Sequence, residues 1–255
     1  MKKVILLLPL LIFIIPDAWA QVNIENDHQY IGDDGTMHIV GEILNDSDKP
    51  LNQIKISAIL YSDNSVIHQA SAETLTNVIM PGMKGAFDII VNEKIDYIDN
   101  YVLDVDYKIT NPKSQVIEIT SAEFRHGPIN NIIIQGTVAN NGDTTANMVK
   151  IIATFYDRDG NVVAVSQART EPDYLRANYE TPFLVTIPDK NQAKKIVDYS
   201  LVAESEEYTA VPEFPLGSGV LLMISLSSYI VLTKNPSMIS QALSRVHNLK
   251  MILKH

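Results

Sequence analysis

The segment DRDGN (157–161) carries the residue types and spacing that come closest to a chemical site in this sequence. Two carboxylates and an amide oxygen at alternate positions can begin a calcium loop, in which oxygen ligands alternate along a turn. The complete loop also needs a glutamate at its twelfth position, where this chain has Ala168. A hairpin turn with Asp-Gly at its tip explains the segment better, so Asp157, Asp159 and Asn161 are only a weak calcium candidate.

Other catalytic or metal-binding arrangements are not indicated. The chain has six histidines, none of them beside a Gly-x-Ser-x-Gly elbow, and it has no cysteine. His38 and His68 are far apart in the sequence, and exposed strand or loop positions explain them better than a metal site does. No glycine-rich phosphate-binding loop is present. We therefore expect a protein that is not an enzyme and needs no cofactor.

One acceptor sequence for N-linked glycans is present, at Asn45-Asp46-Ser47. It falls in a predicted loop, where such sequences are accessible in exported proteins. A second Asn-x-Ser, at 235–237, is excluded because its central residue is proline. Asn45 is therefore the glycosylation candidate.

An internal repeat organises the middle of the chain. Segments 37–69 and 132–167 match at a constant offset of 95 residues, with one residue inserted in a later turn. The matched positions include Gly41 and Gly136, Asn45 and Asn140, Tyr61 and Tyr156, Val66-Ile67 and Val162-Val163, and Phe87 and Phe183. A glycine inside a strand pattern usually marks a bulge or a close backbone approach. The repeat predicts two modules, at residues 21–111 and 112–208, with a turn-forming boundary at Asn111-Pro112-Lys113.

Both modules have the pattern of β-structure. Apolar residues recur at every second position, which indicates strands with one buried face. In the second module the expected inward residues are Val149, Ile151, Ala153 and Phe155, and the outward ones are Lys150, Thr154 and Tyr156. Strands separated by Asn, Asp, Gly and Pro clusters favour antiparallel sandwiches. The expected fold class is all-β, with two tandem immunoglobulin-like antiparallel β-sandwiches.

The segments AILYSDNSVI and ATFYDRDGNVVA resemble the FxLYD-type domain, an immunoglobulin-like β-sandwich of prokaryotic surface proteins. The second copy matches through Phe155, Tyr156, Asp157 and Gly160, whereas the first has Ser62 in place of the aspartate. The resemblance covers most of residues 22–205. It implies a fold more than an activity, because such domains accompany many functions.

The N-terminus has the layout of a secretory signal peptide. Lys2 and Lys3 precede an apolar run, and Ala18-Trp19-Ala20 is a small-x-small cleavage site. Residues 1–20 are therefore expected to be removed by cleavage after Ala20. The run is short for a spanning helix, which needs about 20 residues.

The charge of the chain is unevenly distributed. Residues 21–215 contain 29 acidic and 14 basic side chains, whereas the basic residues of the C-terminal tail are opposed by no acid. An acidic exported portion argues against a nucleic-acid partner, since binding to phosphates needs a positive footprint.

The C-terminus has the pattern of a membrane anchor. After a linker at 209–215, residues 216–233 contain no charge and would reach about 27 Å as a helix, close to a bilayer core. Residues 234–255 then form a basic tail with helical amphipathic spacing, which suits the cytoplasmic leaflet. We expect a single-pass cell-membrane protein in contact with membrane lipid, with its ectodomain outside and its C-terminus in the cytoplasm.

Pro212, Glu213 and Phe214, followed by Pro215 and the apolar run, resemble the PEF-type C-terminal sorting signal of archaeal surface proteins. That resemblance implies processing near the motif by an archaeosortase. Such signals usually end just after the basic residue that closes the run, whereas this chain continues for about 20 residues. Retention as a permanent anchor and removal by cleavage both stay open, and the long tail favours retention.

The patterns together predict a surface protein with a structural, adhesion or protein-interaction ectodomain. Its expected partners, besides membrane lipid, are other cell-envelope proteins or copies of itself. The alternative is a solute-binding or sensory ectodomain accessory to a membrane transporter, which predicts a ligand between the two modules.

Overall fold

Strands account for nearly all of the regular structure. The computed structural model describes residues 22–93, 98–128, 131–187 and 189–211, and all statements below concern these residues. They form an all-β arrangement of several antiparallel sheets, as the alternating pattern predicts. The single exception to antiparallel pairing is a short parallel contact between the last strand and the first strand of the second module.

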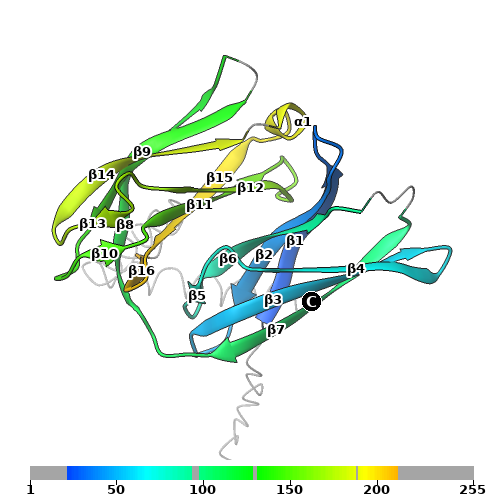
Figure 1. Ribbon diagram of the computed structural model, residues 1–255, viewed down its shortest axis with the longest axis horizontal. Coiled ribbons are helices and arrows are strands. Elements are labelled where there is room, and N and C mark those ends of the chain that lie inside the picture. Colours follow the sequence, from blue (N-terminus) through cyan, green and yellow to red (C-terminus); the bar gives the residue numbers. More distant parts are fainter. Residues whose placement is uncertain (1–21, 94–97, 129–130, 188, 212–255) are drawn as a thin grey trace, which may run out of the picture. The chain divides into compact units, whose positions relative to one another are not determined.

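Module 1 denotes the first seven strands. They are β1 (Val22–Ile31), β2 (Met37–Asn45), β3 (Leu51–Ser62), β4 (Ser65–Glu73), β5 (Val78–Ile79), β6 (Lys84–Val91) and β7 (Asn100–Ile109). One sheet has the order β1-β2-β6, and in the other β3 lies between β4 and β7 and also pairs with β5 (Figure 1). A core with Ile39, Ile56, Leu60 and Phe87 lies between the two sheets.

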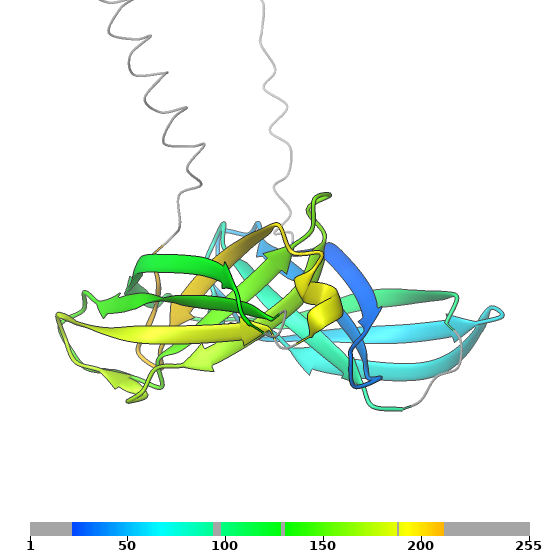
Figure 2. The same cartoon turned by 90° about the horizontal axis from the view of Figure 1, so that it is seen from above.

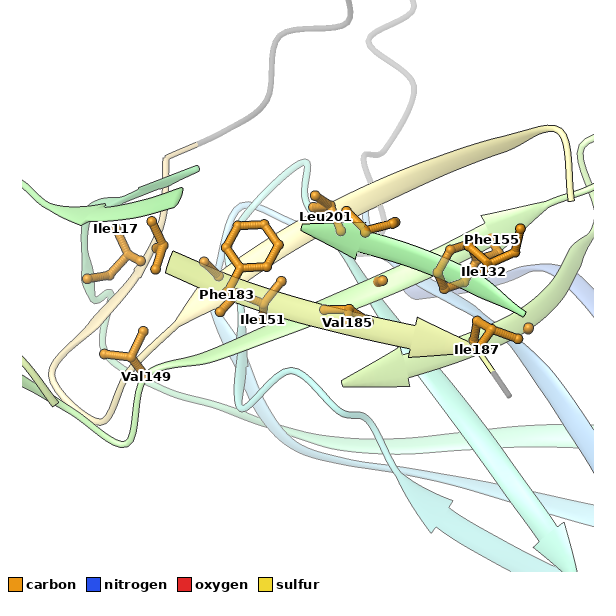
Figure 3. Close-up of a cluster of buried hydrophobic side chains, with 14 of the residues drawn as sticks. Ile117, Ile132, Val149, Ile151, Phe155, Phe183, Val185, Ile187 and Leu201 are labelled. Carbon is orange, nitrogen blue, oxygen red and sulfur yellow. The ribbon is translucent and has the colours of Figure 1, made fainter. Parts of the chain in front are cut away.

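Module 2 denotes the remaining elements. They are β8 (Ser114–His126), β9 (Ile132–Asn140), β10 (Ala146–Asn147), β11 (Lys150–Tyr156), β12 (Val162–Arg169), β13 (Tyr174–Leu175), β14 (Tyr179–Ile187), α1 (Lys190–Ala193), β15 (Asp198–Glu204) and β16 (Tyr208–Ala210). Its main sheets have the orders β14-β9-β8-β16 and β12-β11-β15. The core between them contains Ile151, Phe155, Phe183 and Leu201, whose side chains converge in Figure 3.

The internal repeat extends to individual contacts. A Cβ atom on Gly41 would lie 2.7 Å from Phe87 Cζ, and one on Gly136 would lie 2.7 Å from Phe183 Cζ. Each glycine therefore allows a phenylalanine ring to pack against its strand, which is the close approach that the sequence predicts.

The paired asparagines have equivalent roles in the two modules. Asn45 Nδ2 donates hydrogen bonds to Lys49 O and Ile79 O, and Asn140 Nδ2 donates to Thr144 O and Leu175 O, all at 2.8–2.9 Å. Both side chains are fully buried. Each asparagine therefore fixes the loop that follows its strand.

The contacts of the chain divide it after Val211, and the first of the two units contains both modules. Both cores and every described sheet lie within residues 22–211, which we call the two-module fragment. The only helix among the described residues is the four-residue α1, too short to cross a bilayer. The expected signal peptide (1–20), transmembrane helix (216–233) and tail (234–255) lie outside the described residues.

Candidate functional site

The outer faces of two sheets, one from each module, meet in a contact that we call the seam. In module 1 Val40 and Ala86 point away from the core of their own module, yet they are 0% and 3% exposed. In module 2 Ile152 and Val162 likewise lie outside their module's core and are 2% and 0% exposed. Strand β12 lies against β1, β2 and β6, so each module covers apolar side chains of the other.

A buried carboxylate, Glu42, lies within the seam. It is 2% exposed, and its Oε1 accepts a 2.6 Å hydrogen bond from the hydroxyl of Tyr156 in module 2. Its Oε2 lies 3.0 Å from Lys84 Nζ and accepts a longer bond from Asn26. Burial, followed by the charge of Glu42, raises the pKa of Tyr156, so this phenol stays a donor. A buried charge is tolerated where it is paired and hydrogen-bonded in this way.

A second buried carboxylate, Glu204, closes one end of the seam. Its Oε1 lies 3.0 Å from Lys150 Nζ and accepts a 2.8 Å hydrogen bond from the backbone N–H of Asn77 in module 1. Lys150 Nζ in turn donates to Leu75 O, also in module 1. Burial raises the pKa of Glu204, and the nearby ammonium of Lys150 only partly offsets this effect. The ion pair thus belongs to module 2, while its hydrogen bonds reach module 1.

The turn between β1 and β2 and the start of α1 bind each other at another part of the seam. Asp33 N donates to Asp189 Oδ2 at 2.8 Å, and Lys190 N donates to Asp33 Oδ2 at 2.9 Å. Asp189 also caps α1 through its other oxygen, which accepts from the N–H groups of Asn191 and Gln192. The two segments lie side by side in both views (Figures 1 and 2).

A cavity of about 380 Å³ opens between these elements, and we call it the seam cavity. Its lining includes Tyr30, Asp34, His38 and Asp88 from module 1, with Asp189 from module 2. Carboxylates predominate among its charged groups, so the cavity favours a cationic or hydrogen-bond-donating ligand. No group of three or more His, Asp or Glu side chains in the described residues is placed to hold a metal ion.

A histidine–carboxylate pair at the seam cavity joins His38 and Asp88. His38 Nδ1 lies 2.9 and 3.0 Å from the two oxygens of Asp88, and the imidazole stacks on Tyr30 with ring centroids 4.8 Å apart. The hydrogen bond to Asp88 raises the pKa of His38, against the opposing effect of burial. Burial and the neighbouring carboxylates raise the pKa of Tyr30. The prediction that His38 is an exposed strand histidine is wrong, since its side chain is 17% exposed and paired.

The weak calcium candidate lies in the turn between β11 and β12. Asp157 Oδ1 accepts hydrogen bonds from the N–H groups of Asp159 and Asn161, both at 2.9 Å, and Oδ2 accepts from Asn161 Nδ2. Gly160 has a φ of 84°, a conformation that suits glycine. Asp157 therefore uses its oxygens within the turn, in line with the hairpin interpretation.

The geometry at Asn45 argues against the predicted glycan. A glycan would be attached to Asn45 Nδ2, the atom that donates hydrogen bonds to Lys49 O and, in the interior, to Ile79 O. Its Oδ1 also accepts from Ser47 Oγ at 2.6 Å. Attachment in the folded module would break this network. Ala20 and the sorting-motif candidates Pro212, Glu213 and Phe214 lie outside the described residues.

Sequence reasoning did not identify the seam carboxylates Glu42 and Glu204. Their hydrogen-bond partners in the opposite module, Tyr156 and Asn77, are more than 100 residues away in the chain, so no local motif marks them. The alternation of inward and outward positions along the strands does contain a sequence signal for the seam. Val40, Ile152 and Val162 are apolar residues at positions that the alternating pattern places on an outer face, which indicates a second covering layer.

Comparison with known proteins gives no family. No family model matches the chain, and no curated protein matches it. Solved structures with a similar arrangement include the exo-chitosanase CsxA of Amycolatopsis orientalis, at 12% identity and a TM-score of 0.28, over 74% of this chain and 26% of that one. A β-glucuronidase of glycoside hydrolase family 2 gives 12% identity and a TM-score of 0.26, over 72% and 23% of the two chains. The transglutaminase of red sea bream gives 7% identity and a TM-score of 0.23, over 76% of this chain and 31% of that one. The chain spans about a quarter of the length of the first of these proteins.

Proposed function

We propose that this chain is an exported, membrane-anchored surface protein with a non-catalytic structural or adhesion ectodomain. In this proposal the two modules are immunoglobulin-like sandwiches of the FxLYD type, released from a signal peptide and held by residues 216–233. The observation that carries the proposal is the seam. Glu42 and Glu204 are both buried, and each accepts a hydrogen bond from the opposite module. Such a contact keeps outward-facing surfaces in a fixed relation, which is what an interaction module requires.

The first test addresses topology. The full chain would carry one epitope tag directly after Ala20 and another after His255, and intact cells would be treated with an added protease. We expect loss of the first tag and protection of the second. Protection of both tags in intact cells would contradict export.

The second test addresses interaction. Beads coated with the two-module fragment should bind to cells that display the full chain, and free fragment should compete for this binding. Beads coated with heat-unfolded fragment are the control. Equal binding of both bead types would contradict an adhesion role.

The seam cavity favours a second candidate function, the solute-binding or sensory ectodomain. This alternative places a ligand between the modules, where Asp34, Asp88 and Asp189 line the cavity beside His38. A panel of cationic solutes, tested by calorimetry on the two-module fragment, separates the two functions. Saturable binding that Asp88→Asn weakens would favour the sensory role, and absence of binding would favour the adhesion role.

A further inference from the structure

The duplication gives each module two outer sheet faces, and the seam covers only one face of each. The seam uses the outer face of β2 and β6 in module 1, and the outer face of β11 and β12 in module 2. The matching surfaces are the outer face of β3 and β4, which we call the open face of module 1, and the outer face of β9 and β14, the open face of module 2. Each open face therefore corresponds to a face of the other module that is covered in the seam.

The strand registers establish this correspondence residue by residue. Tyr61 pairs with Val66 across a register shift, and Tyr156 pairs with Val162 across the same shift in module 2. On the other sheets Asp88 pairs with Val40, and the matching Leu184 pairs with Gln135. The open faces thus have the strand geometry of the faces that meet in the seam.

Exposure separates the matched positions sharply. Val162 is 0% exposed within the seam, whereas its counterpart Val66 is 52% exposed. Leu184 is 53% exposed, whereas its counterpart Asp88 lines the seam cavity with a side chain that is 18% exposed. The other module covers Val162 and Asp88, whereas Val66 and Leu184 have no equivalent cover among the described residues.

The open face of module 1 is apolar over several neighbouring positions. Ile59 pairs with Val102 and Tyr61 pairs with Val66, which places these four side chains on one face of adjacent strands. Val102 is 50% exposed. Clusters of exposed apolar side chains of this kind mark interaction sites more often than isolated ones do.

The open face of module 2 is hollowed. A groove of about 790 Å³ lies over β8, β9 and β14 and is lined by Thr137, Pro182, Leu184 and Glu171, among others. Thr137 and Pro182 match Glu42 and Ala86 in the seam, because both pairs are direct cross-strand partners. The groove therefore occupies the position where module 1 receives β12.

The two open faces carry opposite charges at the positions that correspond to one end of the seam. In the seam, Lys150 reaches across to Leu75 O of module 1. The repeat matches Lys150 with Lys55 and Leu75 with Glu171, and both Lys55 and Glu171 are exposed. A contact built like the seam would bring the ammonium of Lys55 close to the carboxylate of Glu171.

We propose that a second copy of this chain binds head to tail, with the open face of module 1 of one copy seated in the groove on module 2 of the next. Because the two surfaces differ, the contact is heterologous and leaves one open face at each end of a pair. Pairing therefore extends into chains of copies. This proposal deepens the proposed adhesion function, since it names the copy as the partner, and it rests on that function for its cellular meaning.

The first test is sedimentation velocity of the two-module fragment over concentrations up to the millimolar range. We expect species that grow with concentration. Val66→Arg and Leu184→Arg should each reduce the association constant by at least about tenfold, because each places a charge in the apolar contact. Ile31→Arg, at a position that is also exposed but lies on the β1–β2 hairpin, is the matched control and should leave association unchanged.

Mixing the two variants tests the head-to-tail arrangement itself. The Val66→Arg copy keeps an intact groove, and the Leu184→Arg copy keeps an intact apolar face. At a concentration where each variant alone is monomeric, an equimolar mixture should therefore form dimers that do not grow further. A mixture that stays monomeric would show that the two faces do not bind each other.

A charge swap tests the register. Lys55→Glu and Glu171→Lys should each weaken association, and the double variant should restore it. Failure of the double variant to recover would contradict a contact built like the seam.

The outcomes separate this proposal from the proposed function. A fragment that remains monomeric at every concentration would overturn self-association, while the tag experiment on intact cells would still test export and anchoring. Association in solution together with failed export would support self-association and contradict the proposed location at the cell surface.

Discussion

Module 1 and module 2 keep the same interior and present different exteriors. Inside, each packs a phenylalanine ring on a strand glycine, and each fixes a loop with a buried asparagine. Outside, matched residues such as Val66 and Val162 have the same chemistry and opposite exposure. The comparison teaches that the repeat determines how each module folds, whereas the surroundings of each face determine what that face can bind.

The largest expected effect concerns the shared interior. Replacing Asn45 or Asn140 with alanine removes a fully buried side chain and its hydrogen bonds to two backbone carbonyls, of Lys49 and Ile79 or of Thr144 and Leu175, at a cost of about 3 kcal/mol in the free energy of unfolding. Urea denaturation of the two-module fragment measures this cost. Similar losses in both variants would support equivalent interiors, and a loss in only one would break the equivalence.

A smaller effect is expected at the seam. Tyr156→Phe removes the hydroxyl that donates to the buried Glu42 and should cost about 2 kcal/mol, since hydrogen bonds to charged groups are the stronger ones. The matched control is Tyr61→Phe, because Tyr61 occupies the same position in module 1 and faces no second module. Equal effects of the two substitutions on urea denaturation would contradict the seam.

The smallest effect is a pH dependence that belongs to module 1. The hydrogen bond to Asp88 raises the pKa of His38 above its unfolded value, so the pair stabilises the fold fully below about pH 6.5. This stabilisation is lost as the pH rises through the higher folded pKa. Asp88→Asn should flatten this part of the stability profile, by less than about 1 kcal/mol because the pair is partly solvated.

The control for this pH effect is Leu184→Asn, at the matching position of module 2, which should leave the slope unchanged. His28, whose pKa is lowered mainly by burial, contributes a slope of opposite sign and is present in both variants. An unchanged slope in Asp88→Asn would show that the His38–Asp88 pair does not control the effect.

The sequence predicted the parts of this molecule that depend on local pattern. The period of two placed Ile151 and Phe155 in the core of module 2, and the repeat aligned Gly41 with Gly136. The Asp-Gly segment at 157–161 folds as the expected hairpin turn. Each of these features is determined within one module or within one turn.

The seam was not predictable in the same way, because it depends on how two complete modules meet. Glu42 and Tyr156 are 114 residues apart, and either residue alone looks like an ordinary solvated side chain on an outer face. The burial of Asn45 was unpredictable for the same reason. Its sequon is readable from three residues, whereas its burial depends on Ile79, which lies 34 residues further along.

The most direct test of the central claim is the distance between the modules. The chain has no cysteine, so Ser71→Cys in β4 and Thr186→Cys in β14 provide two exposed sites for spin labels. Pulsed electron spin resonance on the double variant, diluted into unlabelled fragment, would report the distance within single copies. Modules fixed by the seam predict one narrow distance distribution, which Tyr156→Phe broadens. A broad distribution in the otherwise unchanged fragment would show that the modules move independently and would contradict the account.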